Sequence, residues 1–273
     1  MFNPLLRSWE KYFTIAQWDQ RGAGKTFHRN GKDGSGSITF GRLAQDGIEV
    51  AEYLCSKLNQ PKLILIGSSV GSLTGLLMAS LHPELFYAYV GTDQNAPDPE
   101  HIYYQSRLDA FRSIGSKKGI QLMEKMGPDV SKWSMDDFKQ NNQLVVKAIR
   151  GVPNMIMDLI LPSMIASPDH KLSDIFDIFK GMDFSLEHLY DELIHFDYSR
   201  FNNRFELPFF IFHGESDIIT PTAVAKMYYE VIEAPYKEFV TIRHAGHLAC
   251  FGRPDQFLDE LIHRVRPLAT VKR

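Results

Sequence analysis

The sequence predicts an α/β fold, in which a mostly parallel sheet is flanked by helices. The aliphatic run Lys62–Ile66 is too short for a helix and has the composition of a strand buried on both faces of a sheet, and Phe209–Phe212 is interpreted as a further strand. Apolar side chains recur every three or four residues along Phe40–Leu58, which indicates a helix, and Leu73–Leu81 is interpreted as another. Strands that alternate with helices are typical of a parallel sheet.

Three further runs complete the predicted sheet. Tyr12–Trp18 is interpreted as a short buried strand that leads into a glycine-punctuated turn. Phe86–Val90 and Phe239–Ile242 are interpreted as strands as well. The segment Gly31–Ser37, rich in glycine and serine, is expected to form a loop.

Residues 95–205 have helical patterns, several prolines and little strand character. We therefore predict an α/β core formed by residues 1–94 and 206–273, with a helical cap of residues 95–205 inserted after the third strand. An insertion there lies at the carboxyl edge of the sheet, where open α/β folds bind ligands. We expect methionine and aromatic side chains of the cap to form an apolar pocket, namely Met155, Met157, Met164, Phe176 and Phe179.

Composition excludes several classes of protein. The 273 residues carry 30 basic and 33 acidic side chains, and this net charge of −3 argues against a nucleic-acid partner. Neither a signal peptide nor an apolar run long enough to span a bilayer is recognisable, so we expect a cytoplasmic protein without a membrane partner. Cys55 and Cys250 are too few for a disulfide framework and are expected to be reduced.

The strongest local signal is Gly67-Ser68-Ser69-Val70-Gly71, which matches the pattern G-x-S-x-G between a predicted strand and a predicted helix. Such a tight turn exposes the hydroxyl of its central serine at the edge of the sheet, and we expect it to need small residues on both sides. The N-terminus of the following helix provides free N–H groups for an oxyanion. Ser69 is therefore the candidate nucleophile, and Ser68 and Ser72 do not have the required spacing.

A serine hydroxyl needs a base, and histidine is the usual one. His247 follows the last predicted strand and is the first candidate, with His244 as its rival. Asp217 follows the preceding strand and is the candidate carboxylate that orients the imidazole, with Glu215 as the alternative. The order Ser69, Asp217, His247 along the chain is the order found in α/β hydrolases.

No cofactor or metal is expected. Gly24-Lys25-Thr26 resembles the end of a phosphate-binding loop, but Asp19 stands where that motif requires glycine. His244 and His247 have no acidic or cysteine neighbours in the sequence that would complete a metal site.

At this point the chain resembles a known family. The segment Trp18–Thr26 is similar to the DQRGxGxS/T segment of the proline iminopeptidase branch of α/β hydrolases, and His213–Asp217 and Gly246-His247 match its acid and base segments. The resemblance implies an α/β-hydrolase core with a helical cap. It also implies release of an N-terminal residue, often proline, from small peptides, and relatives in this branch are esterases or amidases.

Two features depart from that family. The family has an HGGPG loop before the DQRG segment, and this loop supplies one N–H that binds the oxyanion. The residue after the nucleophile, here Val70, supplies the other. This chain has no HGGPG loop. Three explanations stay open: a truncated gene product, a gap filled by another subunit in a homo-oligomer, or direct pairing of Tyr12–Trp18 with Lys62–Ile66. The acidic residues that would recognise a substrate amine are assigned by region only, to Glu187, Asp191, Glu192 and Asp197.

The sequence therefore predicts a serine hydrolase that cleaves an amide or ester of a small molecule or short peptide through an acyl-enzyme. A proline iminopeptidase-like peptidase is the first expectation and a carboxylesterase the second. A non-catalytic binding protein of the same fold is the alternative from another class, and the absent HGGPG loop favours it.

Overall fold

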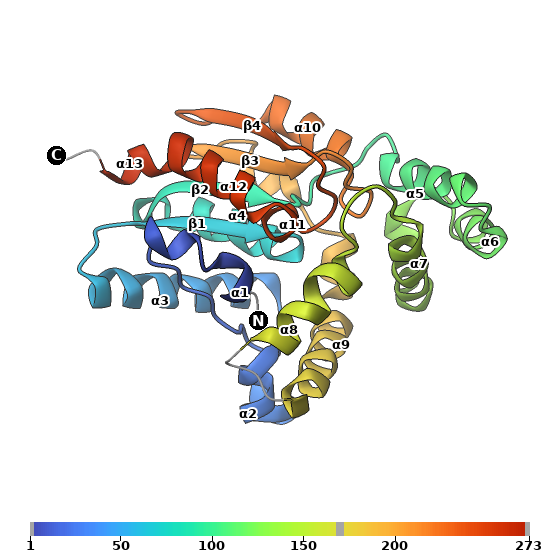
Figure 1. Cartoon of the computed structure of the whole chain (residues 1–273), viewed down its shortest axis with the longest axis horizontal. Coiled ribbons are helices and arrows are strands. Elements are labelled where there is room, and N and C mark those ends of the chain that lie inside the picture. Colours follow the sequence, from blue (N-terminus) through green and yellow to red (C-terminus); the bar gives the residue numbers. More distant parts are fainter. Residues whose placement is uncertain (1–2, 168–171, 271–273) are drawn as a thin grey trace.

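A four-stranded parallel sheet forms the centre of the computed structural model, which describes residues 3–167 and 172–270 (Figure 1). Its strands lie side by side in chain order. They are β1 (Leu63–Ser68), β2 (Phe86–Thr92), β3 (Phe209–Gly214) and β4 (Lys237–Ile242). The predicted α/β class, with a mostly parallel sheet flanked by helices, is confirmed.

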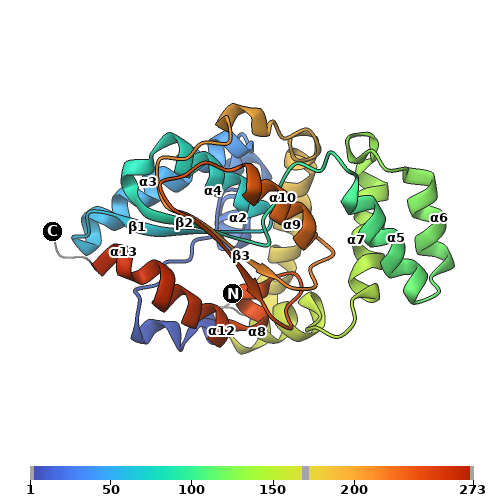
Figure 2. The same ribbon diagram turned by 90° about the horizontal axis from the view of Figure 1, so that it is seen from above.

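Helices cover both faces of the sheet (Figure 2). One face packs against α3 (Phe40–Leu58), α4 (Val70–Leu81) and α10 (Thr222–Val231). The other packs against four short helices and one three-residue turn of helix: α1 (Asn3–Leu6), η1 (Trp9–Lys11), α11 (Ala249–Gly252), α12 (Pro254–Glu260) and α13 (Arg266–Thr270). A π-helical turn, η6 (Leu261–Val265), joins α12 to α13.

Strand β3 is covered on both faces, which explains why its sequence is apolar from Phe209 to Phe212. Phe209 and Ile211 point into the core beside α3 and α4, whereas Phe210 and Phe212 point into the core beside α12. All four side chains are inaccessible to solvent. A strand covered on both faces needs no polar alternation, which is why this run is continuous.

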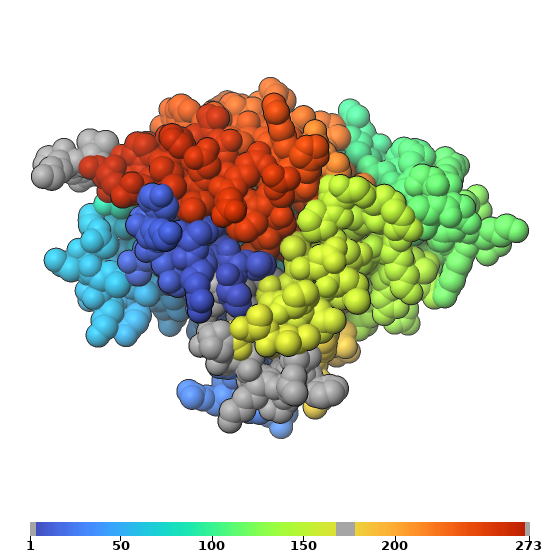
Figure 3. Space-filling model, viewed as in Figure 1, coloured from blue at the N-terminus to red at the C-terminus, as the bar shows by residue number. Residues whose placement is uncertain are grey.

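Residues between β2 and β3 form the long helical insertion. Its elements are α5 (Ile102–Ser113), α6 (Lys117–Met126), η3 (Val130–Lys132), α7 (Met135–Ala148), η4 (Met155–Ile160), α8 (Leu161–Ala166), α9 (Leu172–Ile194) and η5 (Tyr198–Phe201). In Figure 3 the yellow-green surface near α8 lies between the dark blue N-terminal segment and the green surface of α5–α7. A short turn of helix, η2 (Pro83–Leu85), precedes β2.

The segment after Trp18 packs against this insertion. Helix α2 (Gly24–Ser35) lies against α9, where the Phe27 and Phe184 rings are 5.2 Å apart and the Ser185 hydroxyl donates to Gly22 O at 2.9 Å. These contacts bring the turn that precedes α2 to the edge of the insertion.

The predicted strand at Tyr12–Trp18 is wrong. No residue of this segment pairs with a strand among the described residues, and β1 pairs only with β2. Phe13 and Ile15 instead pack against the core beneath α12, while the side chains of Tyr12 and Trp18 are 44% and 42% exposed. Consequently the insertion follows β2, the second strand, and direct pairing of this segment with β1 does not occur.

The predicted loop at Gly31–Ser37 is also largely helical. Helix α2 continues to Ser35 across a kink at Gly31, whose φ is +64°. Glycine tolerates this conformation, and packing against α9 outweighs the loop propensity of the segment. In the described parts of the chain, no helix is both long and apolar enough to cross a membrane.

We expect Phe257→Ala to lower the free energy of unfolding by about 3–5 kcal/mol. The Phe257 ring is fully buried, stacks on Trp9 at 5.5 Å and meets Phe212 at 5.3 Å, so truncation leaves a cavity between α12 and the sheet. Urea unfolding followed by circular dichroism measures the change.

The matched control is Phe179→Ala, because the Phe179 side chain is 43% exposed. It should change the free energy of unfolding by less than about 1 kcal/mol. Equal effects of the two substitutions would contradict a packing centre at Phe257.

Candidate active site

Ser69 lies in a strained turn between β1 and α4. Its φ of +52° and ψ of −127° are rare for a residue with a side chain. A Cβ atom at Gly67 would lie 3.0 Å from Gly71 O and 3.0 Å from Ser72 Cα, so this position needs glycine. At Gly71 a Cβ would meet nothing within 4 Å. The predicted crowding therefore holds on one side of Ser69 only.

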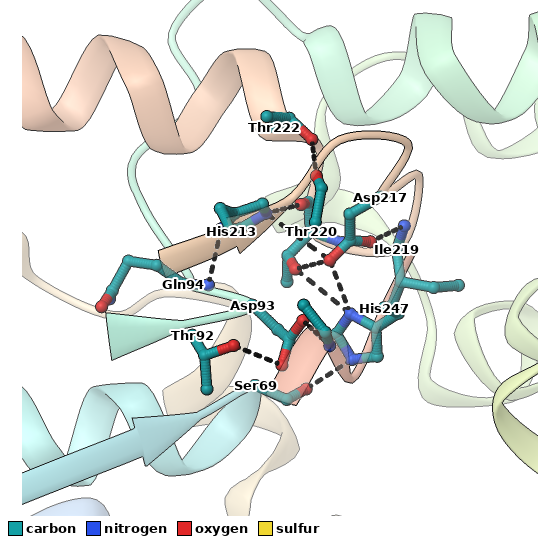
Figure 4. Close-up of polar contacts among 12 residues, drawn as sticks. Ser69, Thr92, Asp93, Gln94, His213, Asp217, Ile219, Thr220, Thr222 and His247 are labelled. Carbon is teal, nitrogen blue, oxygen red and sulfur yellow. Dashed lines mark hydrogen bonds and ion pairs between the residues drawn. The ribbon is translucent and has the colours of Figure 1, made fainter. Parts of the chain in front are cut away.

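Three side chains that are far apart in sequence meet in one hydrogen-bonded chain (Figure 4). His247 Nε2 lies 2.9 Å from Ser69 Oγ, and His247 Nδ1 lies 2.9 Å from Asp217 Oδ2. Because a carboxylate only accepts, Nδ1 carries the proton and Nε2 accepts from the serine hydroxyl. The strand ends supply this geometry: Ser69 follows β1, Asp217 follows β3 and His247 follows β4.

The turn after β3 holds Asp217 from the side opposite His247. Asp217 Oδ1 accepts from the backbone N–H groups of Ile219 at 2.8 Å and Thr220 at 3.0 Å. The Thr220 hydroxyl donates to Oδ2 at 2.8 Å. His213 strengthens this turn, since its Nε2–H donates to Thr220 O at 2.8 Å while its Nδ1 accepts from Gln94 N at 3.2 Å.

Burial and charge oppose each other at the pair formed by Asp217 and His247. Burial by itself would raise the pKa of Asp217, but the charge of His247 and the hydrogen bonds to both nearby histidines lower it overall. Burial by itself would lower the pKa of His247, but the charge and hydrogen bond of Asp217 raise it above the ordinary 6.5. The carboxylate therefore stays ionised and stabilises a protonated imidazole.

The rival residues have other partners. Ser72 Oγ donates to Ser69 O at 2.6 Å, and Ser68 Oγ donates to Asp93 Oδ2 at 3.0 Å. His244 is exposed, and its backbone N–H donates to Glu215 Oε2 at 3.0 Å. None of these four rivals takes a place in the chain of hydrogen bonds through His247.

Asp93 is a buried carboxylate near the site that the sequence analysis missed. It follows β2 directly and is inaccessible to solvent. Its Oδ2 accepts from Ser68 and Thr92 hydroxyls, and its Oδ1 accepts from Ala249 N at 3.0 Å. One side chain thus joins the ends of β1 and β2 to the loop that carries His247. A carboxylate shortly after the predicted strand Phe86–Val90 was the available signal.

Burial raises the pKa of Asp93, and the neighbouring Asp217 charge raises it further, while His247 and the Ala249 N–H lower it. Oxygen and nitrogen atoms of Asp93, Asp217 and His247 lie within 4.8 Å of one another, a spacing that could hold a metal ion. However, Asp217 Oδ1 accepts two N–H groups, and the other carboxylate oxygens also accept hydrogen bonds. These groups are organised as a hydrogen-bonded site and present no free ligand set for a cation.

A cavity of about 1040 Å³ opens beside Ser69 and His247. Val70 lines it next to Ser69, and its N–H is unpaired within α4 because it is the first residue of that helix. Gln20 and Ala23 bring the turn before α2 to the same wall. The helical insertion supplies much of the remaining wall, chiefly with apolar side chains such as Val146, Met155, Leu186, Leu189 and Leu193.

The acidic residues assigned by region do not line this cavity. Glu187 lies 3.9 Å from Lys139, and the Asp191 side chain is 95% exposed. Glu192 accepts a hydrogen bond from Phe40 N at 2.8 Å and so serves the start of α3. Asp197 Oδ1 caps η5 through Ser199 N at 2.9 Å. Helix α9 presents a different face to the cavity.

The apolar residues expected around the pocket are also divided. Met155 and Met157 line the cavity. Met164 is buried in a separate cluster with Leu159 and Ile178, and Phe179 is exposed. The side chain of Phe176 lies outside the described residues.

Comparisons with known proteins agree with this architecture. The family model of the alpha/beta hydrolase fold matches residues 1–114. The chain is 28% identical over 264 residues to the probable aminopeptidase YbaC of Bacillus subtilis (strain 168), covering 94% of this chain and 81% of that protein.

Two solved structures are similar in fold. VinJ has a TM-score of 0.63 at 15% identity, covering 98% of this chain and 86% of that chain. A hydrolase from Pseudomonas aeruginosa PA01 has a TM-score of 0.55 at 17% identity, covering 96% and 83%. With its parallel sheet, its strand-to-helix serine turn and these likenesses, the chain has the α/β-hydrolase fold.

Proposed function

We propose that this chain is a serine hydrolase that cleaves an amide or ester bond through an acyl-enzyme. The observation that carries the proposal is the uninterrupted chain from Ser69 Oγ through His247 to Asp217, with 2.9 Å at each step. Both distances lie within the range for proton transfer between a nucleophile and its base.

In the proposed reaction, His247 Nε2 takes the hydroxyl proton of Ser69 as its oxygen attacks the substrate carbonyl. The imidazolium that forms is stabilised by Asp217. It then gives the proton to the leaving amine or alcohol, and the bond to that group breaks. A water molecule, deprotonated by His247, cleaves the acyl-enzyme and restores Ser69. These steps use only the chain's own side chains and water.

The tetrahedral intermediate carries a negative oxygen, for which we propose the N–H of Val70 as one donor. Its place at the first position of α4 supports this role, since the helix N-terminus adds a partial positive charge there. Each such donor is worth about 10²–10³ in rate.

An aminopeptidase of the proline iminopeptidase type is the first candidate activity. The similarity to a probable aminopeptidase and the DQRG-like segment at Asp19–Gly22 support it. A carboxylesterase is the second candidate, supported by the largely apolar wall of the cavity and by the position of Glu187, Asp191 and Glu192 away from it.

We expect a fluorophosphonate probe to label the protein at Ser69, because this reagent reports a serine activated by a base. Mass spectrometry locates the label. Ser69→Ala should lose it, whereas Ser113→Ala, at an exposed serine of α5, should keep it. Folded protein that takes no label would leave a non-catalytic binding protein as the better description. Prolyl aryl amides and short-chain aryl esters then separate the two candidate activities.

We expect Asp217→Asn to lower the labelling rate by about 10⁴-fold, since the amide no longer holds the imidazole in the required tautomer. His247 must be neutral to act as a base, so labelling falls as the pH drops through its raised pKa. Without the Asp217 charge, burial dominates and the pKa of His247 falls. In a plot of labelling rate against pH, measured from about pH 5 to 9, the acidic limb should therefore move to lower pH. An unchanged limb would contradict the assignment of Asp217.

Asp93→Asn should also move this limb to lower pH, because the Asp93 charge raises the pKa of His247. It should lower the free energy of unfolding by about 1–3 kcal/mol, since an amide nitrogen cannot accept from Ser68 or Ala249. The control Asp259→Asn, at an exposed carboxylate, should stay within about 0.5 kcal/mol. A loss of stability with no shift of the limb would limit Asp93 to a structural role.

A further inference from the structure

A buried arginine lies on the wall of the active-site cavity. Arg107 belongs to α5, its side chain is 2% exposed, and it lines the cavity together with Ser69 and His247. Its Nη2 donates to Ile219 O at 3.3 Å, and the N–H of the same Ile219 donates to Asp217. The guanidinium therefore adjoins the turn that holds the proposed catalytic acid.

The partners of this guanidinium are all uncharged. Nη1 donates to Asn141 Oδ1 at 2.5 Å, and the group lies over the Trp133 ring at 5.7 Å. Among the described residues, no carboxylate lies within ion-pair distance of Arg107, and its buried Nε–H has no acceptor. Burial lowers the pKa of Arg107 to about 10, while Tyr103 and Asp217 raise it, so the side chain stays cationic at neutral pH.

The acidic residues on the cavity wall are engaged elsewhere. Asp98 accepts from two backbone N–H groups at the start of α5. Asp129 accepts from Ser131, and Asp183 faces Lys139 at 3.8 Å. A buried cation without an ion-pair partner is unfavourable, so an anionic group of a bound molecule would be stabilised beside Arg107.

The chemistry of that partner follows from the donor. A guanidinium forms short, charge-assisted and often bidentate hydrogen bonds with a planar carboxylate. Resting on the proposed function, we infer that Arg107 binds a carboxylate of the substrate, and that the preferred substrate is an amide or ester with an apolar body and a free carboxylate.

Two positions of that carboxylate are open to test. It could belong to the acyl group, as in the half-ester of a dicarboxylic acid, or to the leaving group, as in the C-terminal residue of a dipeptide. Both place one anionic group beside Arg107 and leave the apolar wall to the rest of the molecule.

Binding is measured first, in protein that cannot turn over. In a Ser69→Ala background, calorimetry should find that hexanoate binds about 10- to 100-fold more tightly than hexanamide. Arg107→Met, which keeps an unbranched side chain of high helix propensity, should remove this difference. Lys147→Met, at the other cation on the wall, should preserve it. Arg107→Lys should retain part of it.

If the Ser69→Ala protein binds hexanoate no more tightly than hexanamide, the inference is overturned, and this result does not depend on any Arg107 variant. Equal weakening of both ligands by Arg107→Met overturns it as well, because that result describes a structural residue. If the wild-type protein takes no fluorophosphonate label but the Ser69→Ala protein still prefers hexanoate to hexanamide, only the proposed function is overturned.

Turnover by the wild-type enzyme then locates the carboxylate. The pairs are mono-4-nitrophenyl glutarate against 4-nitrophenyl butyrate, and Pro-Gly against Pro-Gly amide. In one pair kcat/KM should favour the carboxylate by about 10- to 100-fold, and Arg107→Met should abolish that preference. If neither pair shows it, the inference fails.

Discussion

The parallel alignment of the strands is the constraint on which the site depends. Because β1, β2, β3 and β4 run in the same direction, their carboxyl ends meet at one edge of the sheet. Ser69, Asp93, Asp217 and His247 each follow one of these ends and so meet in space, although Ser69 and His247 are 178 positions apart. The two central strands, β2 and β3, are almost wholly buried, so the polar groups of the site lie in the turns that follow the strands.

Buried charges around His247 shift its pKa in opposite directions. Asp217 and Asp93 favour the imidazolium, whereas Arg107 and burial itself favour the neutral ring. Hydrogen bonds from Thr220, Ser68 and Ala249 spread the negative charge of the two carboxylates. Together these groups raise the pKa of His247 above its ordinary 6.5, which stabilises the imidazolium that the proposed reaction forms. Arg107 adds a positive charge on the wall of the cavity.

Several elements were predictable from the sequence because local patterns specify them. Helix α3 occupies the predicted range Phe40–Leu58, and β1, β2, β3 and β4 contain or overlap the predicted runs. The segment Tyr12–Trp18 has the same apolar character, but it packs Phe13 and Ile15 against the core and has no strand partner. Strand formation requires a neighbour for the backbone, and a run of residues does not reveal whether one is present.

The residue types and order of the candidate triad can be recognised from local sequence, because the serine turn, the acid segment and the base segment each have short-range signatures. The folded structure was needed to show which acid pairs with His247 and that Asp93 and Arg107 lie near the same site. It also showed that the face of α9 that lines the cavity does not include Glu187, Asp191 and Glu192. These outcomes depend on contacts between residues far apart in the chain, and the rotation of a helix about its axis is set by packing against neighbours.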